Sequence, residues 1–135
     1  MTTTSLTAAT TTVRRPLLRA GVVAGLAASI ATPTVAFLGR SAGISLDIAG
    51  EPIPLYAFAQ LTFIAALLGV GVAALCRRAA SPRTRFLRAT LSLTALSFVP
   101  DALVDAAVST KLLLMATHVV AALVVIPALA RRLGG

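Results

Sequence analysis

Four long apolar segments divide the chain, and short polar connections separate them. The segments cover about residues 19–38, 55–76, 86–106 and 110–130. Each holds about 20 mostly apolar residues, the length that an α-helix needs to cross the hydrocarbon core of a bilayer. The pattern predicts an all-α protein, a single bundle of four membrane-spanning helices.

Polar residues in the third segment recur at steps of three and four, at Thr90, Thr94, Ser97, Asp101 and Asp105. At about 100° per residue they fall within a stripe roughly 80° wide. The opposite face carries leucine and valine, so the segment is expected to be a helix with an apolar face and a polar seam. Pro100 lies inside it, and either kinks the helix or breaks it and opens a short second helix.

Small residues are spaced four apart in the first segment, at Gly21, Gly25 and Ser29. This spacing lets another helix approach closely, and we favour a contact within the bundle over dimerisation. Pro33 is expected to kink this helix. The preceding RRPLLR also resembles a twin-arginine export signal, but three further apolar segments favour a first membrane helix with a basic flank.

The remaining parts of the chain are polar. Residues 1–13 are rich in threonine, carry no charge and show no apolar stripe, which predicts a disordered tail before a single domain at 14–135. Residues 39–54 contain glycines and prolines and are expected to form a loop rather than a lid over the bundle. The alternation from Ile44 to Ile48 indicates an extended stretch there.

Composition supports a membrane location. The chain is 58% hydrophobic and 12% charged, whereas soluble domains carry about 25% charged residues. Its net charge of +8 comes without an aromatic–basic face, so we expect the lipid bilayer, and not nucleic acid, as its partner. Cys76 is the only cysteine, which excludes an internal disulfide and a CxxC redox pair.

Basic residues gather on one side of the four segments. That side would hold Arg14, Arg15, Arg19, the five arginines of residues 77–88, Arg131 and Arg132, which are ten of the twelve. Only Arg40 and Lys111 fall on the other side, near the four acidic residues. The positive-inside rule therefore predicts a multi-pass protein of the plasma membrane with both termini in the cytoplasm.

Four ionisable residues lie within eighteen positions of each other, Asp101, Asp105, Lys111 and His118. Ionisable groups in membrane helices are costly and usually face a bundle interior or a water-filled cavity. Folding the last two segments into a hairpin pairs Asp105 with Lys111 near the outer surface, as an interfacial ion pair. It also sets His118 level with the turn from Ser97 to Asp101.

Gln60 on the second segment lies at a similar depth. A pocket that opens outward and is lined by Gln60, Ser97, Asp101 and His118 follows as a hypothesis, with a small molecule or a lipid as its ligand. A carboxylate at the depth of Asp101 should be paired or hold a proton, since desolvation disfavours the charged form. His118 alone is typical of a hydrogen-bond partner between helices.

Other functions stay open. Asp101 and His118 could relay protons in a transport or coupling subunit, which would need a homo-oligomer, or the polar residues could only lock the hairpin. An enzyme acting on a lipid is a weaker alternative, because no nucleophile–base–orienter set and no phosphate-binding loop are present. We assign no catalytic residue and no cofactor. A metal site at Asp101, Asp105 and His118 is disfavoured, because the spacing resembles no tight ligand motif.

Three stretches carry a resemblance to a known family: PLYAFAQLT in the second segment, LTALSFVPD in the third and TKLLLMATHVVAALVVIPALARR in the fourth. With them, residues 14–132 resemble a family of small uncharacterised four-helix bacterial membrane proteins, domain of unknown function 6069. The resemblance implies the four-helix topology and a bacterial inner membrane. Since the family has no assigned activity, it implies no mechanism.

Overall fold

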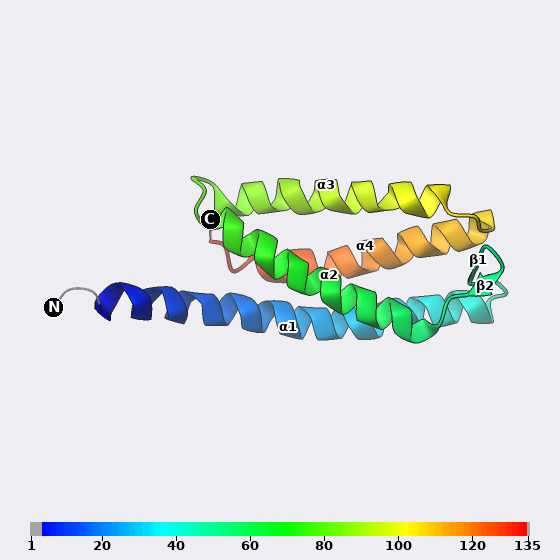
Figure 1. Ribbon diagram of the computed structural model, residues 1–135, viewed down its shortest axis with the longest axis horizontal. Coiled ribbons are helices and arrows are strands. Elements are labelled where there is room, and N and C mark those ends of the chain that lie inside the picture. Colours follow the sequence, from blue (N-terminus) through cyan, green and yellow to red (C-terminus); the bar gives the residue numbers. More distant parts are fainter. Residues whose placement is uncertain (1–3, 135) are drawn as a thin grey trace.

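A computed structural model describes residues 4–134, with side chains from Arg15 onward. The elements in chain order are α1 Thr4–Ser41, β1 Asp47–Ile48, β2 Glu51–Pro52, α2 Leu55–Cys76, α3 Pro82–Leu103 and α4 Val108–Ala130. The four helices are each long and apolar enough to cross a membrane, α1 through its part Arg15–Ser41. The chain is thus an all-α bundle with four candidate spans, as the sequence predicts (Figure 1).

The helix bounds agree with the sequence best where apolar residues reach both ends. α2 spans Leu55–Cys76 as predicted, whereas α3 begins four residues earlier than predicted, at Pro82. Proline fits the first turn of a helix because amide hydrogens there have no carbonyl partner within the helix, so the one that proline lacks is not missed. α3 is continuous through Pro100 to Leu103, so the helix is not broken there.

The predicted tail at 1–13 falls partly outside this description. Residues 1–3 lie outside the described residues, and the backbone of α1 begins at Thr4. No side chain is described before Arg15. The disordered tail stays a prediction.

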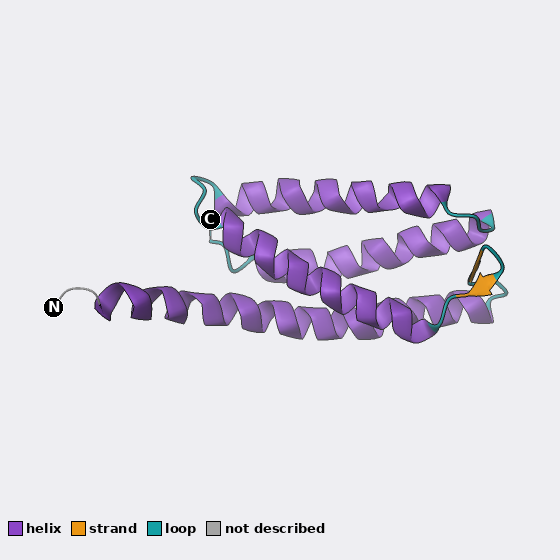
Figure 2. Cartoon of the chain, in the orientation of Figure 1, coloured by secondary structure: helices purple, strands orange, loops and turns teal. Residues whose placement is uncertain are grey.

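The two ends of the bundle differ in charge. The described chain ends and the turn between α2 and α3 lie at one end (Figure 1). We call this the basic end, because its arginines include Arg15, Arg19, Arg131 and Arg132. The strands and the turn between α3 and α4 lie at the other, the acidic end (Figure 2). All four acidic residues of the chain, Asp47, Glu51, Asp101 and Asp105, lie on or beside these elements.

α1 packs closely against α2, and glycine makes that approach feasible. A Cβ atom on Gly21 would lie 2.0 Å from Cγ2 of Val70, and one on Gly25 would lie 2.9 Å from Cβ of Ala66. Both distances are shorter than carbon atoms tolerate. The predicted contact of the small-residue face with another helix is therefore confirmed, and its partner is α2. We call this contact the α1–α2 interface.

Of the two glycines near the end of α2, only one packs closely against another helix. A Cβ on Gly69 would lie 3.3 Å from Leu129 on α4, but one on Gly71 would meet nothing within 4 Å. The two residues are about 200° apart around the helix. Gly71 therefore faces away from the other helices.

The connection between α1 and α2 is a small antiparallel hairpin with Asp47 opposite Pro52 and Ile48 opposite Glu51. Its two turn residues, Ala49 and Gly50, have φ of 51° and 83°, as a tight two-residue hairpin turn requires. The extended stretch predicted at 44–48 thus reaches its regular form only at its last two residues.

Three contacts fasten this hairpin to the bundle. The amide of Ala49 donates to the carbonyl oxygen of Asp105 at 2.8 Å, and the hydroxyl of Thr110 donates to the carbonyl oxygen of Ser45. Leu46 is buried in a cluster with Ala36, Phe58 and Leu113. The connection therefore closes the acidic end of the bundle as a packed cap.

A second buried cluster lies toward the basic end and joins all four helices through residues such as Leu17, Ala73, Phe86 and Leu129. Large apolar side chains elsewhere point outward, among them Ile30, Leu75, Leu96 and Leu123. In a bilayer these positions would contact lipid chains rather than water. The chain is a small multi-pass membrane bundle.

Candidate functional site

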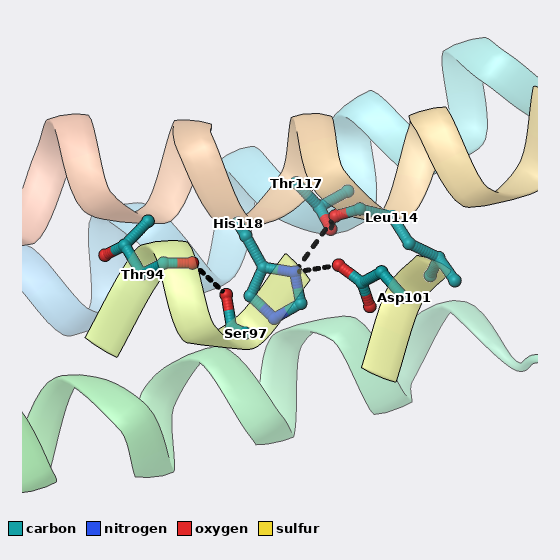
Figure 3. A network of polar contacts seen from close by, with 6 residues as sticks. All are labelled: Thr94, Ser97, Asp101, Leu114, Thr117 and His118. Carbon is teal, nitrogen blue, oxygen red and sulfur yellow. Dashed lines mark hydrogen bonds and ion pairs between the residues drawn. The ribbon is translucent and has the colours of Figure 1, made fainter. Parts of the chain in front are cut away.

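Asp101 and His118 meet between α3 and α4. Oδ2 of Asp101 lies 2.8 Å from Nδ1 of His118, and Figure 3 shows the imidazole reaching from α4 toward α3. Asp101 is in the last turn of α3, and its side chain is only 10% exposed, whereas that of His118 is 43% exposed. The match of depths predicted from the hairpin therefore agrees with the structure.

The contacts of His118 indicate which ring nitrogen carries hydrogen. Nδ1 also lies 3.1 Å from the carbonyl oxygen of Leu114, which can only accept a hydrogen bond. Nδ1 must then be the donor, and in the neutral ring Nε2 is left as an acceptor. Among the described residues, none hydrogen-bonds to Nε2 (Figure 3).

Within the described part of the chain, the carboxylate of Asp101 lacks a well-aligned hydrogen bond, although it lies close to His118. Oδ2 is buried and has no hydrogen bond of good geometry among the described residues. The 2.8 Å approach to His118 is therefore a close contact rather than an aligned hydrogen bond. A buried acceptor left in this state lowers the stability of the fold.

The polar seam of α3 is satisfied within its own helix. The hydroxyl of Thr90 donates to the Phe86 carbonyl at 2.8 Å, that of Thr94 to Thr90 at 2.8 Å, and that of Ser97 to Thr94 at 2.6 Å. None of these three hydroxyls joins α3 to a neighbour through these bonds. Their oxygen atoms remain as weak acceptors on the face of α3 that also carries Asp101.

A cavity of about 340 Å³ lies between α2, α3 and α4, and we call it the α2–α3 cleft. Small side chains make room for it, at Ala65, Ala66 and Gly69 on α2 and at Ala121 and Ala122 on α4. Its polar lining is confined to Thr62, Thr90, Thr94, Ser97 and His118. The cleft is thus a largely apolar space with an imidazole among its walls.

The cleft differs from the polar pocket expected from the sequence. It runs along residues 62–72, 86–97 and 118–129, so it extends from His118 toward the basic end rather than opening at the acidic end. Ser97 and His118 line it, and Asp101 reaches it only through His118.

Gln60 is exposed and does not line the cleft. Phe58 and Thr62 of α2 contact Thr32 of α1, and Gln60, halfway between them, is turned to another side of α2. Its expected depth came from counting helical turns, which does not determine the direction of its side chain.

Lys111 and Asp105 are not joined in the structure. The ammonium of Lys111 donates to the carbonyl oxygen of Ala102 at 2.9 Å, one of the last carbonyls of α3, which lack partners within the helix. No ion pair between these two side chains is present among the described residues. Their interfacial pairing stays a prediction, as do the ligand or proton roles of Asp101, His118, Gln60 and Ser97.

The small residues of α2 and α4 were missed as lining residues. Their signal was present in the sequence as FIAALLG and VAALV, but small residues equally predict close helix contact. Among the described residues, no three metal-ligating side chains come together.

Comparisons with known proteins agree with this architecture and give it no activity. No curated protein and no solved structure matches the chain. One family model does match, and it covers residues 12–135, which include all four candidate spans. The chain therefore belongs to the family described as "Family of unknown function (DUF6069)".

Proposed function

We propose that the protein binds a small, largely apolar molecule in the α2–α3 cleft, and that Nε2 of His118 recognises a hydrogen-bond donor on it, such as a hydroxyl. Asp101 is the positioning residue, because its contact with Nδ1 fixes the ring and leaves Nε2 as the acceptor. The observation that carries the proposal is a half-exposed imidazole with one nitrogen occupied, lining an otherwise apolar cleft.

The size and lining of the cleft support a ligand of this kind. Its volume of about 340 Å³ lies at the lower end of the roughly 300–1,000 Å³ of small-molecule sites. Two of its lining residues on facing helices, Leu68 and Leu93, are 67% and 53% exposed. Both would face lipid in a bilayer, which supports access from the membrane rather than from water.

A photoreactive alkyl alcohol tests the proposal directly. The purified protein in phosphatidylcholine liposomes is irradiated with a ten-carbon alcohol that carries a diazirine group, and the labelled peptides are identified by mass spectrometry. We expect saturable labelling of residues 62–72, 86–97 and 118–129. Excess unlabelled decanol should suppress it, because one site is being occupied.

Matched variants decide between a site and general lipid contact. Ala122→Phe fills the cleft and should abolish the saturable labelling, whereas Ala116→Phe, at an exposed position on the same helix, should leave it intact. His118→Leu should weaken it by roughly tenfold, the factor expected for about 1.4 kcal/mol from a lost hydrogen bond. Labelling spread evenly over the exposed leucines in all variants would refute the proposal.

Proton-linked transport or coupling is the second candidate, and the Asp101–His118 contact favours it. Two titratable groups in contact within a membrane bundle can pass a proton between them. Liposomes that contain a pH-sensitive dye would report proton movement under an imposed gradient. Asp101→Asn should stop any such movement, and wild-type liposomes no leakier than empty ones would exclude this candidate.

We infer the orientation from the charge of the two ends. The basic end should face the cytoplasm, with the plasma membrane as the location. Single cysteines at Ser45 and Ser81 in a Cys76→Ala background test this. An impermeant thiol reagent added outside intact cells should label position 45 and spare position 81, and the reverse pattern would overturn the orientation.

A further inference from the structure

A second cavity lies between α1 and α4 at the basic end, apart from the α2–α3 cleft. Its volume is about 1280 Å³, and four arginines line it, Arg15 and Arg19 of α1 with Arg131 and Arg132 just beyond α4. Arg15 and Arg19 are one helical turn apart and so share a face. Segments more than a hundred residues apart in the sequence thus bring four guanidinium groups to one site.

Among the residues that the structure describes, no acidic side chain lies near these four arginines. Among the described residues, none of them has an ion pair or a side-chain hydrogen bond, and all four are exposed. The acidic residues of the chain lie at the opposite end of the bundle (Figure 1). Four like charges around one cavity repel each other, and an anion bound among them would relieve that repulsion.

The rest of the cavity is apolar, with Val23, Ala27 and Val124 among its lining residues. The side chains on both helices are small here, so a groove continues from the arginines along α1 and α4 toward the middle of the bundle. A free phosphate ion would gain no favourable contact from such an apolar surface. Four positive charges at the end of an apolar groove instead fit an amphiphile with an anionic head and a hydrocarbon chain.

The depth of the arginines fits a lipid head group. From Arg19 to Ser41, α1 is about 33 Å long at 1.5 Å per residue, close to the roughly 30 Å of a hydrocarbon core. Arg19 then lies at the boundary of the hydrocarbon, and Arg15 lies one turn out among the head groups. Basic pockets between membrane helices at this level suit phospholipid phosphates.

We propose that this cavity is a binding site for an anionic phospholipid, whose phosphate contacts the four arginines and whose acyl chain lies along Val23, Ala27 and Val124. Arginine forms bidentate hydrogen bonds with phosphate oxygens. Because one pair of arginines comes from α1 and the other from the turn after α4, a head group with two phosphates should bind more tightly than one with a single phosphate.

The test compares defined lipids on the full-length protein. Purified protein in a neutral detergent is titrated with cardiolipin, phosphatidylglycerol or phosphatidylcholine, and thermal stability and retained lipid by native mass spectrometry are recorded. We expect stabilisation in that order, with little or none from phosphatidylcholine. Sodium phosphate and pyrophosphate at matched ionic strength form a separate arm, and an equal effect from them would overturn the lipid assignment.

Two double variants remove the same charge from the same end. Arg131→Gln with Arg132→Gln should weaken cardiolipin binding by roughly tenfold or more, since two of the four arginines that contact its phosphates are lost. Arg83→Gln with Arg85→Gln changes exposed arginines outside the cavity and should change binding less than threefold. Equal losses in both would mean general attraction to negative surfaces and would overturn the site.

A third variant keeps every charge and blocks the groove. Ala27→Phe, at an exposed position of α1 within the cavity, should weaken cardiolipin binding while leaving the effect of added salt unchanged. It also serves if the arginine variants fail to fold. Unchanged binding in Ala27→Phe would show that the acyl chain does not lie in this groove, and would refute the site as proposed.

Discussion

The α1–α2 interface and the α2–α3 cleft lie on two sides of α2, and small residues line both. At the interface, glycines on α1 let the two helices approach until Gly25 faces the Cβ of Ala66. In the cleft, the same Ala66 lines an open space, together with Gly69 of α2 and Ala122 of α4. Small residues therefore bring helices together only where the facing helix supplies a matching surface.

Threonine is used differently at the two places. At the interface, Thr32 of α1 and Thr62 of α2 share a hydrogen bond of 2.9 Å, so a hydroxyl links two helices. In the cleft, Thr90 and Thr94 donate to carbonyls of α3 itself. At the interface a hydroxyl helps to hold two helices together, whereas the hydroxyls of Thr90 and Thr94 bond within α3 and leave the cleft open.

The largest effect is expected from filling the interface. Gly25→Leu should destabilise the protein by about 3 kcal/mol, at the upper end of typical overpacking costs. The methyl group of Ala66 cannot rotate away from the new side chain, so the helices must separate. Loss of folding in a denaturant titration in detergent measures the effect.

Gly71→Leu is the matched control, because a Cβ there meets nothing within 4 Å. It should change the free energy of unfolding by no more than about 0.5 kcal/mol, as for other surface positions. If Gly25→Leu is tolerated as well as Gly71→Leu, the α1–α2 interface does not exist as described.

A smaller effect is expected at the edge of the cleft. Asp101→Asn should reduce the free energy of unfolding by only about 1 kcal/mol, well below the roughly 3–5 kcal/mol for breaking a fully buried pair. His118 is half-exposed and keeps its contact with Leu114, so the loss of the carboxylate leaves no stranded charge. Labelling by the diazirine alcohol should nevertheless fall, because the ring then keeps only one of the two contacts that orient it.

The opposite result would mean a structural pair. If Asp101→Asn is strongly destabilising and the added change His118→Gln restores stability, then the two residues only hold α3 against α4. The contact between Asp101 and His118 would then serve only the packing of α3 against α4, and it would give no support to a ligand site in the cleft.

Much of the fold could be predicted from the sequence, since segment length and hydropathy decide whether a helix can span a bilayer. α2 was predicted to the residue, and the depth match of Asp101 and His118 followed from counting turns. The start of α3 was missed because Arg83 and Arg85 interrupt the apolar pattern, although Pro82 was an available signal.

The site was less predictable for a geometrical reason. Depth along a helix follows from residue number, but the direction of a side chain depends on which face packs against which neighbour. The side chain of Gln60 does not point into the cleft. The cleft itself was not predicted, because an empty space depends on how several helices pack together. Lys111 binds the carbonyl oxygen of Ala102, which is free because α3 ends at Leu103. The position of Pro100 in the sequence did not predict this end of the helix.

The smallest effect concerns the threonine hydroxyls and tests the comparison most finely. Thr32→Val keeps the shape and removes the hydroxyl that reaches α2. Combined with Thr62→Val in a double-mutant cycle, it should give a coupling of about 0.6 kcal/mol, the average for hydrogen bonds between membrane helices.

Thr94→Val removes a hydroxyl that bonds only its own helix. Such a bond adds little to stability, since it competes with the helix's own hydrogen bonding, and the freed carbonyl of Thr90 keeps its place in the helical ladder. We expect a change near zero and no coupling to Thr62→Val, although Thr62 and Thr94 both line the cleft. A coupling at Thr94 as large as that at Thr32 would mean that α3 is hydrogen-bonded to α2 in the membrane, and that the cleft closes there.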